Sequence, residues 1–395
     1  MGERAPVTLP ARVIEGIDGV DAQAWDACAG DDNPFVSHAF LEALEHSGSV
    51  APATGWAPRH LVLEDEAGGV VGAVPMYLKA HSYGEYVFDH AWADAFERAG
   101  GRYYPKLQVA VPFTPVTGPR LLVRPDVDGI EVERRLLAAS LETARNEGVS
   151  SLHITFPTEK EWRRLGEAGL LLRTGLQFNW ENRGYGSFDD FLADLASRKR
   201  KVIRRERHEA VSAGVRLETL TGDALRPEHW DAFYRFYMET GERKWGYPYL
   251  TRDFFDRIAR TMRERIALMM ASRDGRYVAG ALNFIGTDTL YGRYWGCIED
   301  HRFLHFEACY YQAIEFAIAR GLKRVEAGAQ GPHKLQRGYL PRPTYSAHWI
   351  RHPGLGQAVA EFLRRERAEV DVEIAALSAH GPFRRHAPPS PAGEV

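Results

Sequence analysis

The sequence predicts an α/β protein with mixed (α+β) sheets, built from two tandem copies of one unit. Its 395 residues exceed what a single typical core holds, which indicates about two domains. Apolar runs of strand length alternate with segments of helical periodicity. Four features also recur in the same order in both halves, which indicates an internal duplication. We expect an N-terminal domain over residues 11–183, with an insertion at about 82–116, and a C-terminal domain over residues 214–375.

Each half is expected to begin with two short helices and a hairpin. DAQAWDAC around Trp25 resembles RPEHWDAF around Trp230. Ser37 in NPFVSHAFLEAL and Thr251 in YPYLTRDFFDRI are matching N-cap candidates. The hairpins follow as HLVLEDEAGGVVGAVPMYL, which turns at Ala-Gly-Gly, and IALMMASRDGRYVAGALNFI, which turns at Asp-Gly.

Each half then continues into a helix, a glycine stop and a strand. VERRLLAASLETARNEGVSSLHITF stops its helix at Gly148, and ACYYQAIEFAIARGLKRVEAGA stops at Gly321. Each half is expected to close on an aromatic strand, LQFNW or TYSAHWI. A helix between two strands is the right-handed βαβ arrangement, so we expect mixed sheets with helices on their faces.

A basic segment, SRKRKVIRRERHE, joins the halves. Seven of the ten side chains from Arg198 to Arg207 are cationic, although the net charge is only -3. Ser187 as a cap and Gly214 as a stop predict one long connecting helix over residues 187–213. Such a helix suits a polyphosphate or a nucleic-acid backbone, and no recognition-helix signature points to DNA. A solvated helix face is the alternative. The residues expected to contact phosphate are Arg198, Lys199, Lys201, Arg204 and Arg205.

The remaining composition narrows the class of protein. Cys28, Cys297 and Cys309 form an odd set without CxxC spacing, so we expect neither a disulfide framework nor a thiolate metal site. The first residues lack the apolar region of a signal peptide, and no apolar run has the length of a membrane span. We therefore expect a cytoplasmic protein, with a disordered tail at residues 380–395. No feature demands an oligomer.

The order of elements resembles the GNAT acyltransferase superfamily. LLVRPDVDGIEVERRLLAASLETARNEGVSSLHITF is similar to the central strand–helix–strand unit of that family. Two such halves joined by a basic helix resemble the Fem-type transferases, which attach amino acids to peptidoglycan precursors, and in particular the FemAB-like predicted N-acyltransferases. The resemblance implies an enzyme that forms an amide between an activated acyl or aminoacyl donor and an amine of a cell-wall precursor or a small molecule.

The expected donor depends on the segments that precede the two central helices. Acyl-CoA-using GNAT proteins have a Q/R-x-x-G-x-G/A loop there, whose backbone N–H groups approach the pyrophosphate. This chain has RPDVDG from Arg124 and HRFLHFE from His301, the second without glycine. We expect no tightly bound cofactor, and the resemblance implies aminoacyl-tRNA as donor. An acyl-CoA enzyme with an atypical phosphate loop and a non-catalytic peptidoglycan- or anion-binding protein are the alternatives.

The segment EAGAQGPHKLQRGY is the candidate catalytic region. N-acyl transfer needs a proton acceptor for the amine and donors for the oxyanion. We expect Glu326 or His333 as the base, and Lys334 with Arg337 for the oxyanion or a phosphate; a solvated turn is the alternative. Fem-type proteins often have a Lys two places before a Gly-aromatic pair. Here that pair is Gly338-Tyr339 and the matching place holds Gln336.

Two further expectations concern this region. A strand continuing past Val325 would put Glu326, Gly328 and Gln330 on one face. Replacing Lys334 and Arg337 with Ala is expected to abolish transfer without lowering the melting temperature.

A second cluster and the insertion supply candidate substrate contacts. The resemblance to transferases of this fold implies that the strand before the second central helix borders an acyl channel. The aromatic, charged insertion EYVFDHAWADAFERAGGRYYPKLQVAVPFTPVTGPR is expected to form a wall for the acceptor. Core packing and a structural lid are the alternatives. His301 and His305 lie four residues apart, but without a third ligand we expect no metal site. The substrate-binding candidates are Asp89, Trp92, Tyr104, Lys106, Arg293, Tyr294, Trp295, Glu307, Gln330 and Tyr339.

Overall fold

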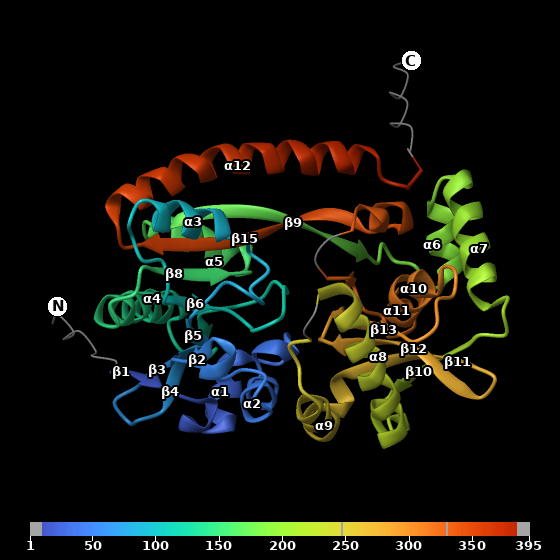
Figure 1. Cartoon of the computed structure of the whole chain (residues 1–395), viewed down its shortest axis with the longest axis horizontal. Coiled ribbons are helices and arrows are strands. Elements are labelled where there is room, and N and C mark those ends of the chain that lie inside the picture. Colours follow the sequence, from blue (N-terminus) through green and yellow to red (C-terminus); the bar gives the residue numbers. More distant parts are fainter. Residues whose placement is uncertain (1–9, 246–247, 329–330, 385–395) are drawn as a thin grey trace, which may run out of the picture.

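A computed structural model describes residues 10–245, 248–328 and 331–384 of the chain (Figure 1). The prediction of mixed α/β sheets in two tandem halves is confirmed. The N-terminal half contains β1 (Ala11–Ile14), α1 (Ala22–Ala29), α2 (His38–His46), β2 (Trp56–Pro58), β3 (His60–Glu64), β4 (Val70–Val74), β5 (Met76–Lys79), α3 (His90–Arg98), β6 (Lys106–Val109), β7 (Leu122–Val123), α4 (Gly129–Asn146), β8 (Ser151–Thr155), α5 (Glu159–Glu167) and β9 (Leu171–Glu181).

The C-terminal half repeats much of this order. The chain first passes through α6 (Phe188–Asp194) and α7 (Ser197–Val211). The half then contains β10 (Arg216–Thr221), α8 (Pro227–Trp245), α9 (Arg252–Thr261), β11 (Ile266–Arg273), β12 (Arg276–Ile285), β13 (Thr289–Cys297), α10 (Leu304–Phe306), a π-helical turn (Glu307–Tyr311), α11 (Gln312–Ala319), β14 (Arg324–Glu326), a 3-10 turn (Pro332–Arg337), β15 (Leu340–Ile350) and α12 (Pro353–Ala379).

The repeated features occupy matching places. Trp25 and Trp230 are both buried. The Ser37 hydroxyl accepts from the amide of Phe40, and the Thr251 hydroxyl accepts from that of Phe254, so both predicted N-caps are confirmed. The capped helices α2 and α9 pack against each other, with an edge-to-face contact between Phe40 and Phe254 at 5.8 Å. The duplicated helices therefore form much of the contact between the halves.

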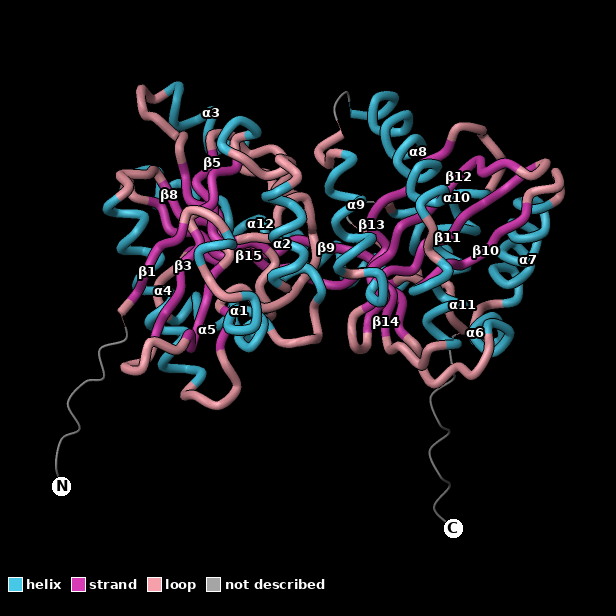
Figure 2. Tube along the Cα trace, turned by 90° about the horizontal axis from the view of Figure 1, so that it is seen from below, coloured by secondary structure: helices cyan, strands magenta, loops and turns pink. Residues whose placement is uncertain are grey.

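One sheet runs through both halves. Its strand order is β10-β11-β12-β13-β14-β9-β15-β8-β6-β5-β2, and a second sheet, β1-β3-β4-β7, belongs to the N-terminal half. The predicted closing strands β9 and β15 are exchanged: β9 pairs with β14 of the C-terminal half, and β15 pairs with β8 of the N-terminal half. They also pair antiparallel with each other, from Leu340 opposite Asn179 to His348 opposite Leu171. Figure 2 shows these strands bridging the halves.

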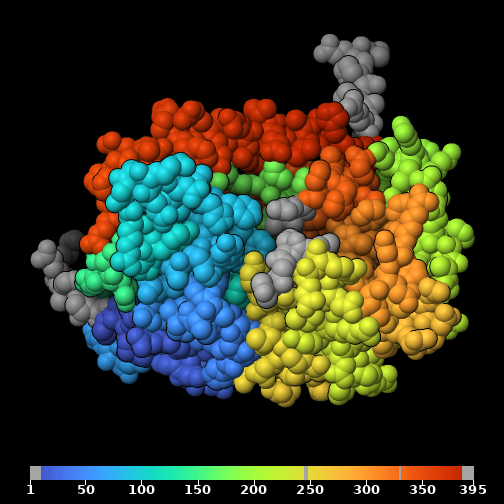
Figure 3. All heavy atoms as spheres, viewed as in Figure 1, coloured from blue at the N-terminus to red at the C-terminus, as the bar shows by residue number. Residues whose placement is uncertain are grey.

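The insertion at 82–116 is partly regular, since it contains α3 and β6. Helix α12 lies over β9 and β15, and Figure 3 shows it running along one edge of both halves. The predicted disordered tail falls mostly at residues 385–395, outside the described residues.

The single connecting helix predicted over residues 187–213 is wrong, because the chain breaks between α6 and α7. Leu195 is extended and buried, and forms a β-bridge with Phe383. The amide of Ala196 donates to the carbonyl of Pro382, and the amide of Arg384 donates to that of Asp194. These long-range bonds replace helical ones at the break, and sequence periodicity carries no sign of them. Ser187 caps α6 as predicted.

Candidate functional site

The candidate site lies where two parallel strands of the C-terminal half separate. β13 and β14 pair only from Thr289–Tyr291 to Arg324–Glu326, after which β13 continues to Cys297 and β14 ends. A register shift between Leu282 and Asn283 of β12 leaves Arg293 as an extra residue on β13. Such bulges re-aim side chains, often beside functional sites. Because β14 ends at Glu326, the expected alternation through Gly328 is wrong: Gly328 has a φ of 73°, and Gln330 lies outside the described residues.

Glu326 stands at the end of the paired segment. Its side chain is 5% exposed, and burial raises the pKa of its carboxyl to about 7, partly offset by Arg324 and Arg293. Arg324 Nη1 approaches its Oε1 at 3.7 Å, which is longer than a hydrogen bond. A carboxyl with this pKa can accept and return a proton near neutral pH.

Lys334 reaches the same strand end from the 3-10 turn. Its Nζ donates to the carbonyls of Ala327, at 2.7 Å, and Gly328, at 2.8 Å. The side chain is 3% exposed, and burial lowers the pKa of its ammonium group to about 8. An ammonium group has three N–H donors, so two bonds to carbonyls leave one donor.

Arg337 is held by the basic helix α7 and by α10. Its Nη2 donates to Glu206 Oε1 at 2.8 Å and its Nε to Glu206 Oε2 at 3.1 Å. Its guanidinium lies 3.4 Å from the centre of the Phe306 ring, and its Nη1 donates to the carbonyl of His333. Arg337→Ala would leave the Glu206 carboxylate buried without its cation, so these contacts argue against the expectation that the melting temperature stays unchanged.

Two other candidates contact the same turn. His333 Nε2 lies 2.9 Å from the Tyr310 hydroxyl, and burial, with the nearby Arg337 and Lys334, lowers the pKa of its imidazole. Tyr339 is fully buried, and its hydroxyl donates to the carbonyl of Tyr310. The structure therefore brings His333, Lys334, Arg337 and Tyr339 together around one turn, and Lys334 links that turn to the two residues that follow Glu326.

The insertion reaches this site through Phe113. Arg293 Nη2 donates to the carbonyl of Phe113 at 3.0 Å, and the Tyr294 hydroxyl donates to the same oxygen at 3.5 Å. The Arg293 Nε is buried with no hydrogen-bond partner among the described residues, so it is available as a donor. Phe113 has a φ of 58°, a strained value that clusters at functional sites. No pattern in the sequence singles out Phe113.

Trp295 and Glu307 have other partners. Trp295 packs edge-to-face on His305. Glu307 is buried in the π-helical turn, where it accepts from Arg207 of α7 and from Gln312. α10 continues without a break into the π-helical turn and α11, and Phe303 at the start of this helical run has a φ of 63°. The buried Glu307 carboxylate lies in the first turn of the run, where it disfavours an anion such as a pyrophosphate.

The acceptor-wall candidates of the insertion form a separate, buried cluster. Lys106 Nζ donates to Ser82, to Glu85 at 2.8 Å and to Asp89 at 2.5 Å. The Tyr104 hydroxyl bonds Ser82. Trp92 packs edge-to-face on His348 of β15. None of these side chains has a recorded contact with Lys334 or Glu326 in the described part of the chain, so the structure does not bring them into the candidate site.

The basic helix lies against the candidate site. The Lys199 ammonium group donates to the Gln336 side chain, and Glu206 and Arg207 bind Arg337 and Glu307. The opposite face exposes Arg198, Lys201, Arg204 and Arg205. A surface recess of about 550 Å³ on that face is lined by Ser197, Arg198, Lys201, Val202 and Arg205.

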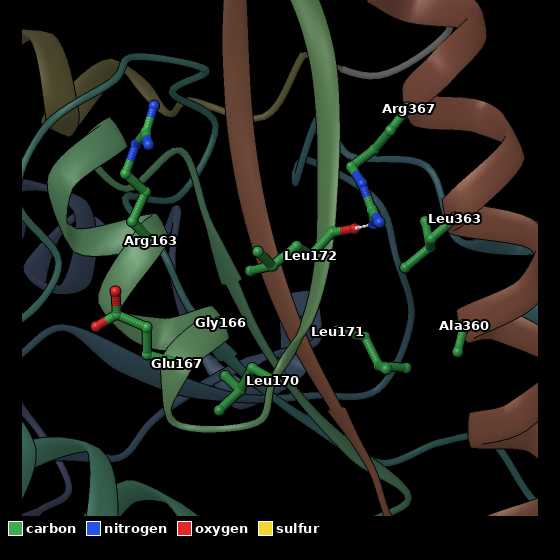
Figure 4. Close-up of a pocket in the computed structure, with 9 residues that line it drawn as sticks. All are labelled: Arg163, Gly166, Glu167, Leu170, Leu171, Leu172, Ala360, Leu363 and Arg367. Carbon is green, nitrogen blue, oxygen red and sulfur yellow. Dashed lines mark hydrogen bonds between the residues drawn. The ribbon is translucent and has the colours of Figure 1, made fainter.

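Glu206 is a residue that the sequence analysis did not single out. The sequence did carry a signal, because Ile203, Glu206 and Ala210 follow helical spacing and therefore share one face of the helix. In the structure that face is buried. A second cavity, of about 560 Å³, lies elsewhere in the fold. Figure 4 shows Leu171, Ala360 and Leu363 between β9 and α12, with Arg163 and Glu167 on α5, and none of its lining residues belongs to the candidate site.

Two features are absent from residues 10–245, 248–328 and 331–384. No group of three or more His, Cys, Asp or Glu side chains that could hold a metal ion occurs there. None of the helices in those ranges combines the length and apolar character that crossing a bilayer requires.

A duplicated unit with a hairpin, a central helix and a parallel strand pair that separates is a tandem GNAT-like fold. The chain belongs to the FemAB-like family, described as peptidoglycan biosynthesis/recognition, whose model matches residues 16–385. No curated protein matches the chain.

Solved structures share this fold at low identity. FemX aligns at 14% identity and a TM-score of 0.54, covering 89% of this chain and 100% of FemX. The C-terminal domain of a lysylphosphatidylglycerol synthetase from Agrobacterium fabrum aligns at 10% identity and a TM-score of 0.52, covering 86% of this chain and 94% of that one. L-PGS from Bacillus licheniformis aligns at 10% identity and a TM-score of 0.50, covering 85% and 98%.

Proposed function

We propose that this protein is a Fem-type N-acyltransferase that transfers an aminoacyl group to an amine of a peptidoglycan precursor. The observation that carries the proposal is Glu326, a buried carboxyl with a pKa of about 7 at the point where β13 and β14 separate. A general base needs a pKa near the working pH and a place beside the reacting amine. Membership of the FemAB-like family supports the substrate class.

The chemistry assigns each group one task. The acceptor amine attacks the ester carbonyl of the donor, and Glu326 accepts the amine proton. The remaining Lys334 N–H and the free Arg293 Nε–H donate to the oxyanion. The ester C–O bond then breaks, and the departing ribose oxygen takes the proton from Glu326. In this scheme Arg337 binds the protein rather than the substrate, and His333 is the second candidate base.

Aminoacyl-tRNA is the proposed donor, and the exposed face of α7 its phosphate contact. Arg198, Lys201, Arg204 and Arg205 present positive charge on the exposed face of the helix that packs against the site. The buried Glu307 carboxylate, in the first turn of the helical run that starts with α10, disfavours the pyrophosphate of coenzyme A. A cytoplasmic location, where charged tRNA is present, belongs to the same proposal.

The experiment is a transfer assay with radiolabelled donors and a wall-precursor acceptor. Aminoacyl-tRNA should give labelled product, acyl-CoA should not, and Glu326→Gln should lower turnover about 10²- to 10⁴-fold. Product from acyl-CoA alone would instead identify an acyl-CoA enzyme with an unusual phosphate site. Precursor binding without product from either donor would identify a non-catalytic binding protein.

A further inference from the structure

Helix α7 has two faces with different partners. Its exposed face carries the cations Arg198, Lys201, Arg204 and Arg205. Its buried face carries Ile203, Glu206 and Ala210, and Glu206 is 5% exposed. A carboxylate on the buried face of a helix is costly unless it is paired and hydrogen-bonded. Glu206 therefore has a structural purpose that the exposed charges of the same helix do not share.

Glu206 binds the turn that carries the site. Arg337 donates to both of its carboxylate oxygens, and the Tyr311 hydroxyl donates to Oε2. The same guanidinium packs on Phe306 and donates to the carbonyl of His333. One two-bond ion pair thus joins α7, the π-helical turn and the 3-10 turn Pro332–Arg337. Such fork-shaped pairs fix geometry as well as distance.

The turn Pro332–Arg337 links the position of Arg337 to the candidate site. Lys334 lies three residues before Arg337, and its amide donates to the carbonyl of Gly331 while its carbonyl accepts from the amide of Tyr339. Its Nζ then reaches the carbonyls of Ala327 and Gly328, next to Glu326. A displacement of Arg337 would therefore move His333 and Lys334 relative to the end of β14.

A gain in stability does not explain the Glu206–Arg337 ion pair. Desolvating two charges offsets most of their attraction, and apolar side chains of similar size often stabilise a core as well. A buried ion pair is better suited to fixing one arrangement among several.

We infer that Glu206 is a positioning residue, which locks the turn bearing His333 and Lys334 onto the helix that receives the donor phosphates. The inference rests on the proposed function, because it treats Lys334 as part of the catalytic group. It adds that helix α7, which is proposed to bind phosphate, and the turn Pro332–Arg337 are held in one fixed arrangement.

The test follows the pH dependence of Lys334 acetylation by acetic anhydride in the full-length protein, read by mass spectrometry. The charged or titratable groups that act on Lys334 are Cys309 and Arg293, and His333 of the same turn is near both Lys334 and Arg337. In Glu206→Gln the charge of Arg337 loses its counter-ion. If the turn stays in place, that charge can only hold or lower the pKa of Lys334. If the turn is released, hydration of the ammonium group raises it.

We expect the labelling midpoint of Glu206→Gln to rise by at least about one pH unit above the wild-type value, because release restores solvation. The matched control is Glu209→Gln, which removes the same charge from the same helix, where Glu209 pairs with Arg302 and Arg205. Its midpoint should match the wild type. An unchanged or lowered midpoint in a folded Glu206→Gln protein overturns the inference.

A double variant separates a loss of positioning from a loss of folding. Glu206→Leu with Arg337→Met removes the pair without leaving a buried charge alone, so the fold should persist. Its Lys334 midpoint should still rise. With an active donor, Glu206→Gln should lower kcat about 10- to 100-fold, with a smaller change in KM. A wild type inactive with every donor refutes the proposed function, whereas the labelling midpoints still decide the positioning role.

Discussion

Each half of this molecule contains a buried carboxyl whose pKa is raised to about 7 by burial, and the two are used differently. Glu161 of the N-terminal half accepts from the backbone amides of Arg120 and Leu121 at 2.6 to 3.2 Å. Its carboxylate also accepts from the amide of Thr158, which completes a capping box of α5. Glu326 of the C-terminal half has Arg324 at 3.7 Å instead. The first carboxyl is committed to the backbone, and the second can exchange a proton.

The cations at the two parallel strand pairs differ in the same way. In the N-terminal half, β6 and β8 pair from Leu107 to Val109, and Arg120 donates from Nε to the carbonyl of Thr155 at the end of β8. Arg120 is fully buried and also donates to the carbonyls of Val116, Gly118 and Pro119. In the C-terminal half, the Arg293 Nε has no partner among the described residues.

The comparison teaches how a duplicated unit can divide its tasks. In the N-terminal copy, Arg120 and Glu161 bond backbone groups at the strand end. In the C-terminal copy, Glu326 and the Arg293 Nε keep hydrogen-bonding capacity beside the strand end, and the exchanged strands β9 and β15 hold the two copies in one sheet. Buried polar atoms without a partner occur in both halves, so the difference lies in these two matched pairs, Arg120 with Glu161 and Arg293 with Glu326.

The largest expected effect comes from substituting the two carboxyls in parallel. Glu326→Gln should lower transfer about 10²- to 10⁴-fold, because an amide cannot act as the base. Glu161→Gln should leave transfer unchanged and lower the free energy of unfolding by about 1–3 kcal/mol, since the new N–H group faces backbone N–H groups. Steady-state kinetics and urea unfolding measure both. Equal losses of activity in the two variants would break the comparison.

Arg120→Met should cost about 3–5 kcal/mol of stability, because it removes one partner from a buried polar network that includes four backbone carbonyls. Arg293→Met should cost much less, since its recorded hydrogen bond is a single one to Phe113. Denaturant midpoints compare the two. A larger loss of stability for Arg293→Met than for Arg120→Met would mean that Arg293, and not Arg120, has the structural role.

The pH dependence of stability should separate Glu326 from its surroundings. Its pKa is 4.5 unfolded and about 7 folded, so between these values the folded state binds more protons and stability falls as pH rises. In Glu326→Gln this fall of stability with rising pH is absent. The variant should match the wild type near pH 4 and exceed it at pH 8 by up to roughly 3 kcal/mol. Chemical unfolding at both pH values checks this; Glu161 is present in both proteins and cancels. A constant difference would mean that Glu326 is solvated.

The sequence was informative where the structure is local. Helix caps such as Ser37 and Thr251, the two hairpins and the glycine stops follow from residues within a few positions of each other. The cluster of Glu326, His333, Lys334 and Arg337 also follows from one short segment. Their partners do not. The Glu206 carboxylate, the Phe113 carbonyl and the Thr155 carbonyl come from segments far along the chain, and local patterns do not encode them.

The same limit explains the two errors of topology. The break at Leu195 depends on a bridge to Phe383, and the exchange of β9 and β15 depends on partners in the other half. The insertion shows the same limit. Asp89 and Lys106, expected in the acceptor wall, pair with each other inside the N-terminal half, and local patterns do not encode that contact.

The smallest effect concerns two exposed helices. Arg198→Gln with Lys201→Gln on α7 should reduce the slope of log K for tRNA binding against log salt by about 2, with about a tenfold loss of affinity at low salt. The control is Arg364→Gln with Arg365→Gln on α12, which removes equal charge from a helix that packs on β9 and β15. Its slope should stay unchanged, because those arginines pair with Glu361 on α12 and do not belong to the basic face of α7. Equal slopes for the two variants would attribute tRNA binding to net charge and not to α7.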